Sequence, residues 1–260
     1  MTILENPVLL PALRLLVGAI VGKENLKLYD TVDWNDTSNY QYPEYYSSQN
    51  FHGIQGGYLN AIAPITYDAV TRFAAPPNEK KQRQLAISAI EGKPRRILDL
   101  GCGTGSSTIM LKQAFPEAEV TGLDLSPQML VMSEYKAQQG KLDIQWVHGL
   151  AEATKFADGE FEVVTASLLF HETPPQVALA ILKEAFRLLK PGGQVIILDG
   201  HQKILRNTTW LADIFEEPYI REYAAGSVDA WLGKAGFSQV ITEDVWWTNQ
   251  LSTGVKSSSN

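Results

Sequence analysis

The sequence predicts an α/β fold in which a mostly parallel sheet is covered by helices. From Arg95 onward, short apolar runs typical of buried strands alternate with longer amphipathic segments typical of helices. The chain has 260 residues, 45% of them hydrophobic and 20% charged, which is enough for one large domain with an added segment. Because right-handed crossovers join such strands, we expect their carboxyl ends to share one edge of the sheet.

An apolar stretch comes first, at residues 7–22 (PVLLPALRLLVGAIVG). Pro11 and Arg14 interrupt it, and it is shorter than the roughly 20 residues that a membrane span needs. We expect a helix that docks its apolar face on the protein. The alternative is an interfacial helix that makes weak contact with a membrane surface.

Residues 23–60 are rich in aromatic side chains. Six of the ten tyrosines lie there together with other rings: Tyr29, Tyr40, Tyr42, Tyr45, Tyr46, Tyr58, Trp34, Phe51 and His52. Asn, Ser, Gly and Pro separate them, so no long regular element is expected. Residues 61–91 are predicted to be helical with a break at 74–79, and we assign 1–91 to an N-terminal extension.

The alternating region, residues 92–256, is expected to form the main domain, with 257–260 as a disordered tail. The expected strands are 96–100, 119–125, 143–149, 161–167 and 194–200, followed by two β-rich runs near Val240 and over 245–251. The expected helices are 106–115, 126–140, 174–193, 210–224 and 227–237. Helix 126–140 has the clearest boundaries, because Ser126 can cap its first turn, Pro127 suits that turn and Gly140 ends it.

Charge and cysteine content exclude several classes of protein. The formal net charge is −7 and no basic cluster stands out, which argues against nucleic acid as the main partner. Cys102 is the only cysteine, so the chain can form neither an intramolecular disulfide nor a thiolate zinc cage. We therefore expect a cytoplasmic protein. No carboxylate and histidine spacing indicates a metal site, and none is expected.

The most informative stretch is ILDLGCGTG at residues 97–105, which joins the first strand to its helix. Gly101, Gly103 and Gly105 permit positive φ and let a ligand approach the backbone. The Lys-Ser/Thr of a P-loop is absent, and Ser106 departs from the dinucleotide fingerprint. These departures leave a ligand other than a phosphate as the better candidate.

Two acidic residues indicate what that ligand is. No basic residue lies between positions 96 and 112, whereas Asp99 precedes the loop and favours a cation. Asp124 ends the second strand, where a carboxylate can accept both hydroxyls of a ribose. A ribose, no phosphate and a positive centre are properties of S-adenosylmethionine (SAM).

LDLGCGTG and GLDLS closely resemble the first two motifs of the class I SAM-dependent methyltransferases. The resemblance covers roughly residues 95–251. The sequences of the motifs are most similar to those of the small-molecule branch that includes the UbiE-type quinone C-methyltransferases. It implies a Rossmann-like, seven-stranded, mostly parallel sheet with helices on both faces and the last strand antiparallel. The family usually places its acceptor-binding additions before the first motif strand, so we expect the aromatic segment to act as a lid over the acceptor. The alternative is that its rings only pack a loose N-terminal extension onto the domain.

The resemblance implies a cofactor site of eleven residues: Asp99, Gly101, Cys102, Gly103, Gly105, Asp124, Leu125, Met129, Ala151, Glu152 and Ser167. The glycines would lie against the methionine part, Asp124 would bind the ribose, and Asp99 would orient the ammonium through water. The sequence departs from the family at Leu150, where many relatives have an aspartate that binds the adenine amino group. Cys102 is expected to be a small filler rather than a reactive thiol.

Methyl transfer needs a base only where the acceptor must lose a proton early, as phenols and enols do. We expect His171, after the fourth strand, to deprotonate or orient the acceptor, assisted by Glu172 or His201. His148 is expected to be structural. The acceptor is expected to be a small apolar or aromatic molecule, such as a quinol or phenol, that contacts the following side chains: Tyr42, Tyr46, His52, Tyr58 and Trp210.

Two other functions remain open on the sequence. One is a SAM-binding regulatory protein without turnover, and the other is an NAD-linked oxidoreductase on a related sheet. Ser106 and the missing basic group argue against the second.

Overall fold

The computed structural model describes residues 40–52, 54–60, 63–74, 79–208 and 217–257. The apolar stretch 7–22, Trp34 and Trp210 lie outside these ranges, so the expectations for them stay untested. Among the described residues, no helix is both long and apolar enough to cross a bilayer.

One seven-stranded sheet forms the centre of the domain, in the order β3-β2-β1-β4-β5-β7-β6. Its strands are β1 (Arg96–Leu100), β2 (Glu119–Asp124), β3 (Gln145–His148), β4 (Phe161–Ser167), β5 (Leu189–Gly200), β6 (Ser238–Val245) and β7 (Asn249–Val255). β1 to β5 pair in parallel, whereas β7 runs antiparallel to both β5 and β6. The predicted seven-stranded, mostly parallel sheet with helices on both faces is confirmed.

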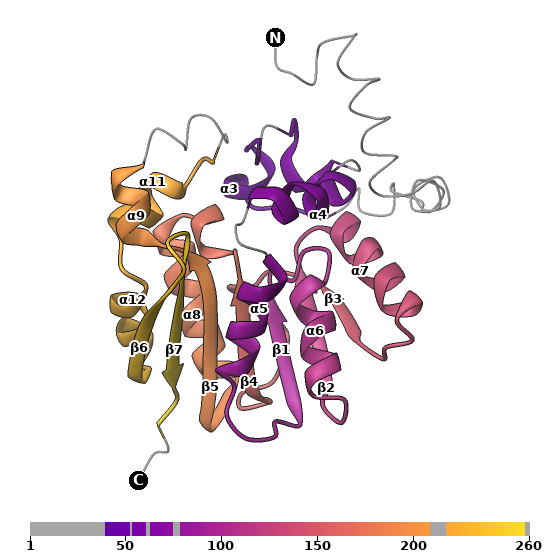
Figure 1. Cartoon of the computed structure of the whole chain (residues 1–260), viewed down its shortest axis with the longest axis vertical. Coiled ribbons are helices and arrows are strands. Elements are labelled where there is room, and N and C mark those ends of the chain that lie inside the picture. The colour runs from indigo at the N-terminus through magenta and orange to yellow at the C-terminus, as the bar shows by residue number, and fades with distance from the viewer. Residues whose placement is uncertain (1–39, 53, 61–62, 75–78, 209–216, 258–260) are drawn as a thin grey trace.

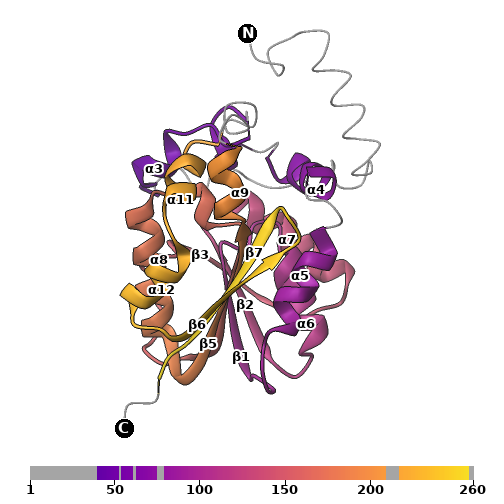
Figure 2. The same cartoon turned by 60° about the vertical axis from the view of Figure 1, so that its left-hand side comes forward.

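Helices cover both faces of the sheet (Figures 1 and 2). They are α3 (Glu44–Ser47), α4 (Ala63–Ala74), α5 (Glu79–Ser88), α6 (Ser106–Ala114), α7 (Pro127–Gln139), α8 (Pro175–Leu188), α9 (Gln202–Asn207), α11 (Ile220–Ala225) and α12 (Val228–Ala235), with 3-10 turns η3 (Gly57–Leu59) and η4 (Phe170–Glu172). Figure 2 shows α5, α6 and α7 on one side and α8 and α12 on the other.

Side chains along each strand point alternately to the two faces of the sheet, and this divides the core into two layers. In β1, Leu98 and Leu100 pack with the helices of the α8 face, while Ile97 packs with Leu111 of α6. Successive side chains of a strand point to opposite faces, so a strand buried on both faces reads as an unbroken apolar run. This explains why β1, β2, β4 and β5 are recognisable in the sequence, whereas β3 has no fully buried residue.

Local signals placed α7 correctly. The Ser126 hydroxyl accepts a hydrogen bond from the Met129 amide at 3.1 Å and caps the helix, and Pro127 is its first residue. The expected break at 74–79 falls between the bounds of α4 and α5, and its residues 75–78 lie outside the described residues. Capping and proline effects are local and need no tertiary context.

The structure differs from the predicted boundaries of three segments: the helices expected at 174–193 and 210–224 and the β-rich run expected at 245–251. Helix α8 stops at Leu188, because the following residues join β5, where the Gly192 amide donates to the Lys256 carbonyl at 2.7 Å. Residues 210–216 of the second range lie outside the described residues, and the described part becomes helical only at Ile220, beyond Pro218. Helix α9 was not predicted. The third range is split by a turn between β6 and β7.

Replacing Gly105 by alanine is expected to lower the free energy of unfolding by about 2 kcal/mol. Gly105 has φ +76°, and an added methyl group would lie 2.7 Å from the Trp146 ring. A matched control is Gly233→Ala in α12, where nothing lies within 4 Å. That change should raise stability by up to about 1 kcal/mol. Thermal unfolding measures both, and an unchanged midpoint for Gly105→Ala would show that the loop tolerates a side chain.

Candidate active site

The glycine loop lies at the carboxyl end of β1 and is bound to the end of β2. Gly101 and Gly103 have φ values of +63° and +53°, a conformation that favours glycine. The Cys102 amide donates to the Leu123 carbonyl at 3.0 Å, and the Gly103 amide donates to Oδ2 of Asp124 at 2.7 Å. A methyl group at Gly103 would meet nothing within 4 Å, so the backbone there faces open space.

Asp124 is a buried carboxylate held by backbone amides. Its Oδ1 accepts from the Ser126 amide at 2.8 Å, in addition to the bond from Gly103. Burial raises the pKa of Asp124 to about 6, although both amide bonds oppose that shift. The carboxylate lines a cavity, where it can accept hydrogen bonds from a ligand.

This cavity extends from the loop to a wall of aromatic rings, and the space between its lining atoms, open solvent included, is about 680 Å³. Seven of the eleven predicted cofactor residues line it: Gly101, Gly103, Asp124, Leu125, Met129, Ala151 and Glu152. Asp99, Cys102, Gly105 and Ser167 are not among its lining residues. The structure thus brings together the residues at the ends of β1, β2 and β3 that the sequence singled out.

The four remaining residues, Asp99, Cys102, Gly105 and Ser167, lie in the loop or at the strand ends but outside the cavity lining. Asp99 is buried and accepts hydrogen bonds from the hydroxyls of Thr108 and Thr165, each at 2.7 Å. The Ser167 hydroxyl accepts from that of Ser107 at 3.1 Å. Burial raises the pKa of the Cys102 thiol well above its usual value, which keeps it protonated and agrees with the expected filler role.

Aromatic side chains of the N-terminal extension form the opposite wall. Five of them line the cavity: Tyr45, Tyr46, Phe51, Tyr58 and Tyr67. Phe51 stacks on Tyr58 with ring centroids 5.1 Å apart, and the Tyr45 hydroxyl donates to Glu152 at 2.6 Å. Figure 1 shows α3 and α4 above the end of the sheet that carries the loop.

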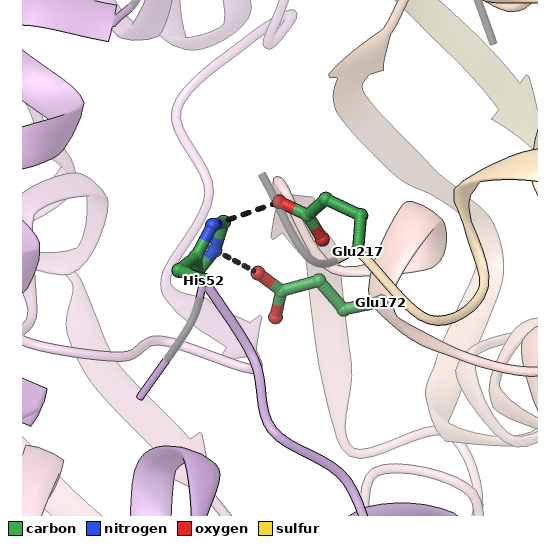
Figure 3. A group of neighbouring side chains, drawn as sticks. All are labelled: His52, Glu172 and Glu217. Carbon is green, nitrogen blue, oxygen red and sulfur yellow. Dashed lines mark hydrogen bonds and ion pairs between the residues drawn. The ribbon is translucent and has the colours of Figure 1, made fainter. Parts of the chain in front are cut away.

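Glu172 connects this wall to the sheet (Figure 3). It lines the cavity, and its Oε1 lies 2.5 Å from the Tyr58 hydroxyl and 3.0 Å from Nε2 of His52. Nδ1 of His52 lies 2.8 Å from Oε1 of Glu217. Burial alone would lower the pKa of His52, but the bonds to the two glutamates outweigh it and raise the pKa to about 10.

His171 lies next to this cluster but is not among the cavity-lining residues. Its Nδ1 is 2.6 Å from Oδ1 of Asp199, and its Nε2 is 3.8 Å from Oε1 of Glu172. Burial opposes the charged imidazole, but attraction to Asp199 prevails and raises the pKa of His171 to about 9. At neutral pH the ring is therefore already protonated, which makes it a poor base there.

Other predicted residues lie away from the cavity lining. His201 pairs through Nε2 with Asp244 at 3.0 Å, at the hairpin of β6 and β7. Tyr42 packs against Tyr46 and His148, and the ring of His148 bonds the Leu125 carbonyl at 3.0 Å. The contacts of His148 agree with the expected structural role.

Sequence reasoning missed several residues of the site. Asp199 and Glu217 bind the two histidines, and Tyr45 and Tyr67 line the cavity. Asp199 is the penultimate residue of a recognisable strand, two positions before His201, so its position was a usable signal. Glu217 lies in a segment without a motif and gave no such signal.

Comparisons with known proteins agree with this geometry. A family model described as a methyltransferase domain matches residues 97–193. An uncharacterized methyltransferase of Synechocystis is 32% identical over 188 residues, which is 68% of this chain and 84% of that protein. The chain belongs to the class I SAM-dependent methyltransferases. This methyltransferase also resembles the demethylmenaquinone methyltransferase of Thermus thermophilus, at 37% identity over 54% of this chain and 63% of that relative.

Solved structures share the fold of this methyltransferase at low sequence identity. A Pyrococcus horikoshii protein covers 72% of this chain and 96% of its own, with a TM-score of 0.56 and 19% identity. A phosphoethanolamine N-methyltransferase of Haemonchus contortus, solved with S-adenosylhomocysteine, has a TM-score of 0.59 and 17% identity. It covers 78% of this chain and 60% of its own.

Proposed function

We propose that this methyltransferase transfers the methyl group of SAM to a small aromatic or apolar acceptor of the quinol or phenol type. The observation that carries the proposal is one cavity with two unlike ends: a glycine loop with Asp124 at one, and aromatic rings with Glu172 at the other. The similarity to demethylmenaquinone methyltransferases supports the quinol class.

The residues at the loop end suit SAM. Asp124 would accept the ribose hydroxyls, Gly101 and Gly103 would lie against the methionine part, and Leu125, Met129, Ala151 and Glu152 would surround the adenine. The acidic groups suit a cation, since Asp124, Glu152 and Glu172 line the cavity and no Lys or Arg is among its described lining residues. SAM supplies an electrophilic methyl group on a positively charged sulfur.

At the other end, the aromatic wall would hold the acceptor and exclude water. Tyr46 and Tyr58 would contact it directly, whereas Tyr42 and His52 would support that wall from behind. Residues 1–91 would thus act as the lid expected from the sequence. Closing aromatic rings over a flat acceptor would align its nucleophilic atom with the methyl group.

We propose that Glu172, rather than His171, is the base that takes the proton from the acceptor. Glu172 lines the cavity, while His171 is set back and is already protonated at neutral pH. The acceptor O–H or C–H bond would break with its proton going to the Glu172 carboxylate. The electron pair left behind would form the new bond to carbon as the carbon–sulfur bond breaks, and His171 with Asp199 would position the glutamate.

Calorimetry and a turnover assay test the proposal. Purified protein should bind SAM but not NADH, and should transfer labelled methyl groups to a demethylmenaquinol analogue or a phenol. SAM binding without transfer to any quinol or phenol would overturn the acceptor class and favour a regulatory role. Binding of NADH alone would overturn the cofactor assignment.

We expect SAM affinity to rise about tenfold between pH 5 and pH 7. With a pKa of about 6, Asp124 is ionised in roughly one molecule in eleven at pH 5 and in ten of eleven at pH 7. The ionised carboxylate is the better acceptor for ribose hydroxyls. Calorimetric titrations at both values measure the effect, and an affinity that stays constant or falls over this range would contradict it.

A further inference from the structure

The strongest unassigned feature of the molecule is the His52, Glu172 and Glu217 cluster (Figure 3). Its members come from three segments: the N-terminal extension, the 3-10 turn after β4 and the chain before α11. Each offers one ligand atom, and these three atoms all lie within 4.8 Å of one another. The mechanism proposed above uses Glu172 alone and leaves His52 and Glu217 without a chemical role.

We propose that His52, Glu172 and Glu217 form a binding site for a divalent transition-metal ion. One imidazole nitrogen and two carboxylate oxygens suit Mn²⁺, Zn²⁺ or Fe²⁺ better than Mg²⁺ or Ca²⁺, which prefer oxygen alone. The sequence did not predict this site, since its ligands are 120 and 45 residues apart along the chain.

The distances fit such an ion. Two ligand atoms at right angles, each about 2.1 Å from a metal, lie about 3 Å apart. Nε2 of His52 and Oε1 of Glu172 lie 3.0 Å apart, which matches this spacing. An ion can take only one ring nitrogen, so Nδ1 would keep its contact with Oε1 of Glu217 at 2.8 Å, and that hydrogen bond would orient the ring. The ligand atom of Glu217 would then be its other oxygen, Oε2.

An unpartnered oxygen gives a second, independent indication. The Glu217 side chain is only 6% exposed, and its Oε2 is buried without a hydrogen bond from any described residue. Buried carboxylate oxygens without a partner are rare, because losing water without compensation is costly. Binding to a cation within the cluster would satisfy this oxygen.

Charge balance also favours a cation. Two carboxylates meet one imidazole here. The described ionisable side chains that interact with the cluster include two further carboxylates, one further histidine and two tyrosines: Asp199, Asp124, His171, Tyr58 and Tyr67. No described Lys or Arg pairs with Glu172 or Glu217. A divalent ion would offset the two glutamates and leave the imidazole neutral.

The position suggests a use that rests on the proposed function. Because Glu172 lines the acceptor end of the cavity, an ion bound there would be accessible to an acceptor oxygen. A bound divalent cation favours the deprotonated form of a hydroxyl. The ion would therefore select oxygen-bearing acceptors, with the proton still leaving to a carboxylate or to water.

Metal binding can be measured without SAM or an acceptor, so its failure is distinct from a failure of methyl transfer. Full-length protein dialysed against a chelator is titrated calorimetrically with Zn²⁺ and, separately, with Mn²⁺. We expect one ion per chain. His52→Ala and Glu217→Gln should each weaken binding by at least about tenfold, since even partners outside the ligand shell have effects of that size.

Glu222→Gln and His201→Gln are matched controls, because both residues lie outside the cluster and should leave metal affinity unchanged. Pulsed electron paramagnetic resonance of the Mn²⁺-bound wild-type protein should show coupling to one histidine nitrogen, a result that does not depend on any variant folding. Absence of saturable binding by both ions would overturn the proposal. So would binding that survives both cluster variants, or a Mn²⁺ signal without nitrogen coupling.

Discussion

Glutamine at position 172 is expected to reduce methyl transfer about 10²- to 10⁴-fold, the usual loss when a general base is removed. Because Gln has the size of Glu, the wall around His52 and Tyr58 should keep its shape. The amide cannot act as a base, so only proton transfer should be lost. Affinity for SAM should change by less than about threefold, because the predicted contacts with SAM lie at the other end of the cavity. Steady-state turnover and calorimetry on the same preparation separate the two effects.

The control for this change is Glu222→Gln, which alters an exposed carboxylate of α11. It should turn over at the wild-type rate. If Glu172→Gln retained near-normal turnover, the proton would have to leave to another group. His171→Ala then becomes the decisive variant, and a large loss there with normal SAM affinity would restore the histidine base expected from the sequence.

Asparagine at position 124 is expected to weaken SAM binding about 100-fold. The Asp124 carboxylate accepts hydrogen bonds from the Gly103 and Ser126 amides, and both of its oxygens are needed for them. In asparagine, an NH₂ group must face one of those amides or the ribose, and a buried donor facing a donor costs about 1–3 kcal/mol. Calorimetric titration with SAM measures the loss.

Asp143→Asn is the matched control, because that carboxylate is exposed and lies outside the cavity lining. It should bind SAM as the wild type does. Asp124→Asn should also abolish the tenfold rise in affinity between pH 5 and pH 7. Wild-type affinity in Asp124→Asn would show that the ribose is bound elsewhere and would overturn the assignment of this end of the cavity.

The parallel part of the fold was predictable because its signals are local. β1, β2, β4 and β5 are buried on both faces and read as continuous apolar runs, and Ser126 with Pro127 marks a helix start wherever it occurs. The start of β5, next to the antiparallel edge of the sheet, was harder to predict. Residues 189–193 became part of β5 because Leu189 pairs with Phe161 of β4, and the backbones of Gly192 and Gly193 bond Lys256, just after β7. Such distant partners cannot be seen from the local sequence.

The loop end of the candidate site was likewise readable. Glycines at 101 and 103 and an acidic residue at 124 follow strands whose carboxyl ends must share one edge, so topology alone brings them together. The acceptor end was not. His52, Glu172 and Glu217 belong to no common motif, and the roles of His171 and Glu172 depend on which of the two faces the cavity.

The sequence by itself determined the sheet, the family resemblance and the loop that would hold SAM, because strand periodicity, capping and glycine conformation are properties of short segments. Only the tertiary structure decided that His171 is buried against Asp199, that Glu172 faces the cavity, and that His52 meets two glutamates. Side-chain burial and ion pairing depend on contacts between distant segments. They arise only when the extension and the chain before α11 pack over the sheet.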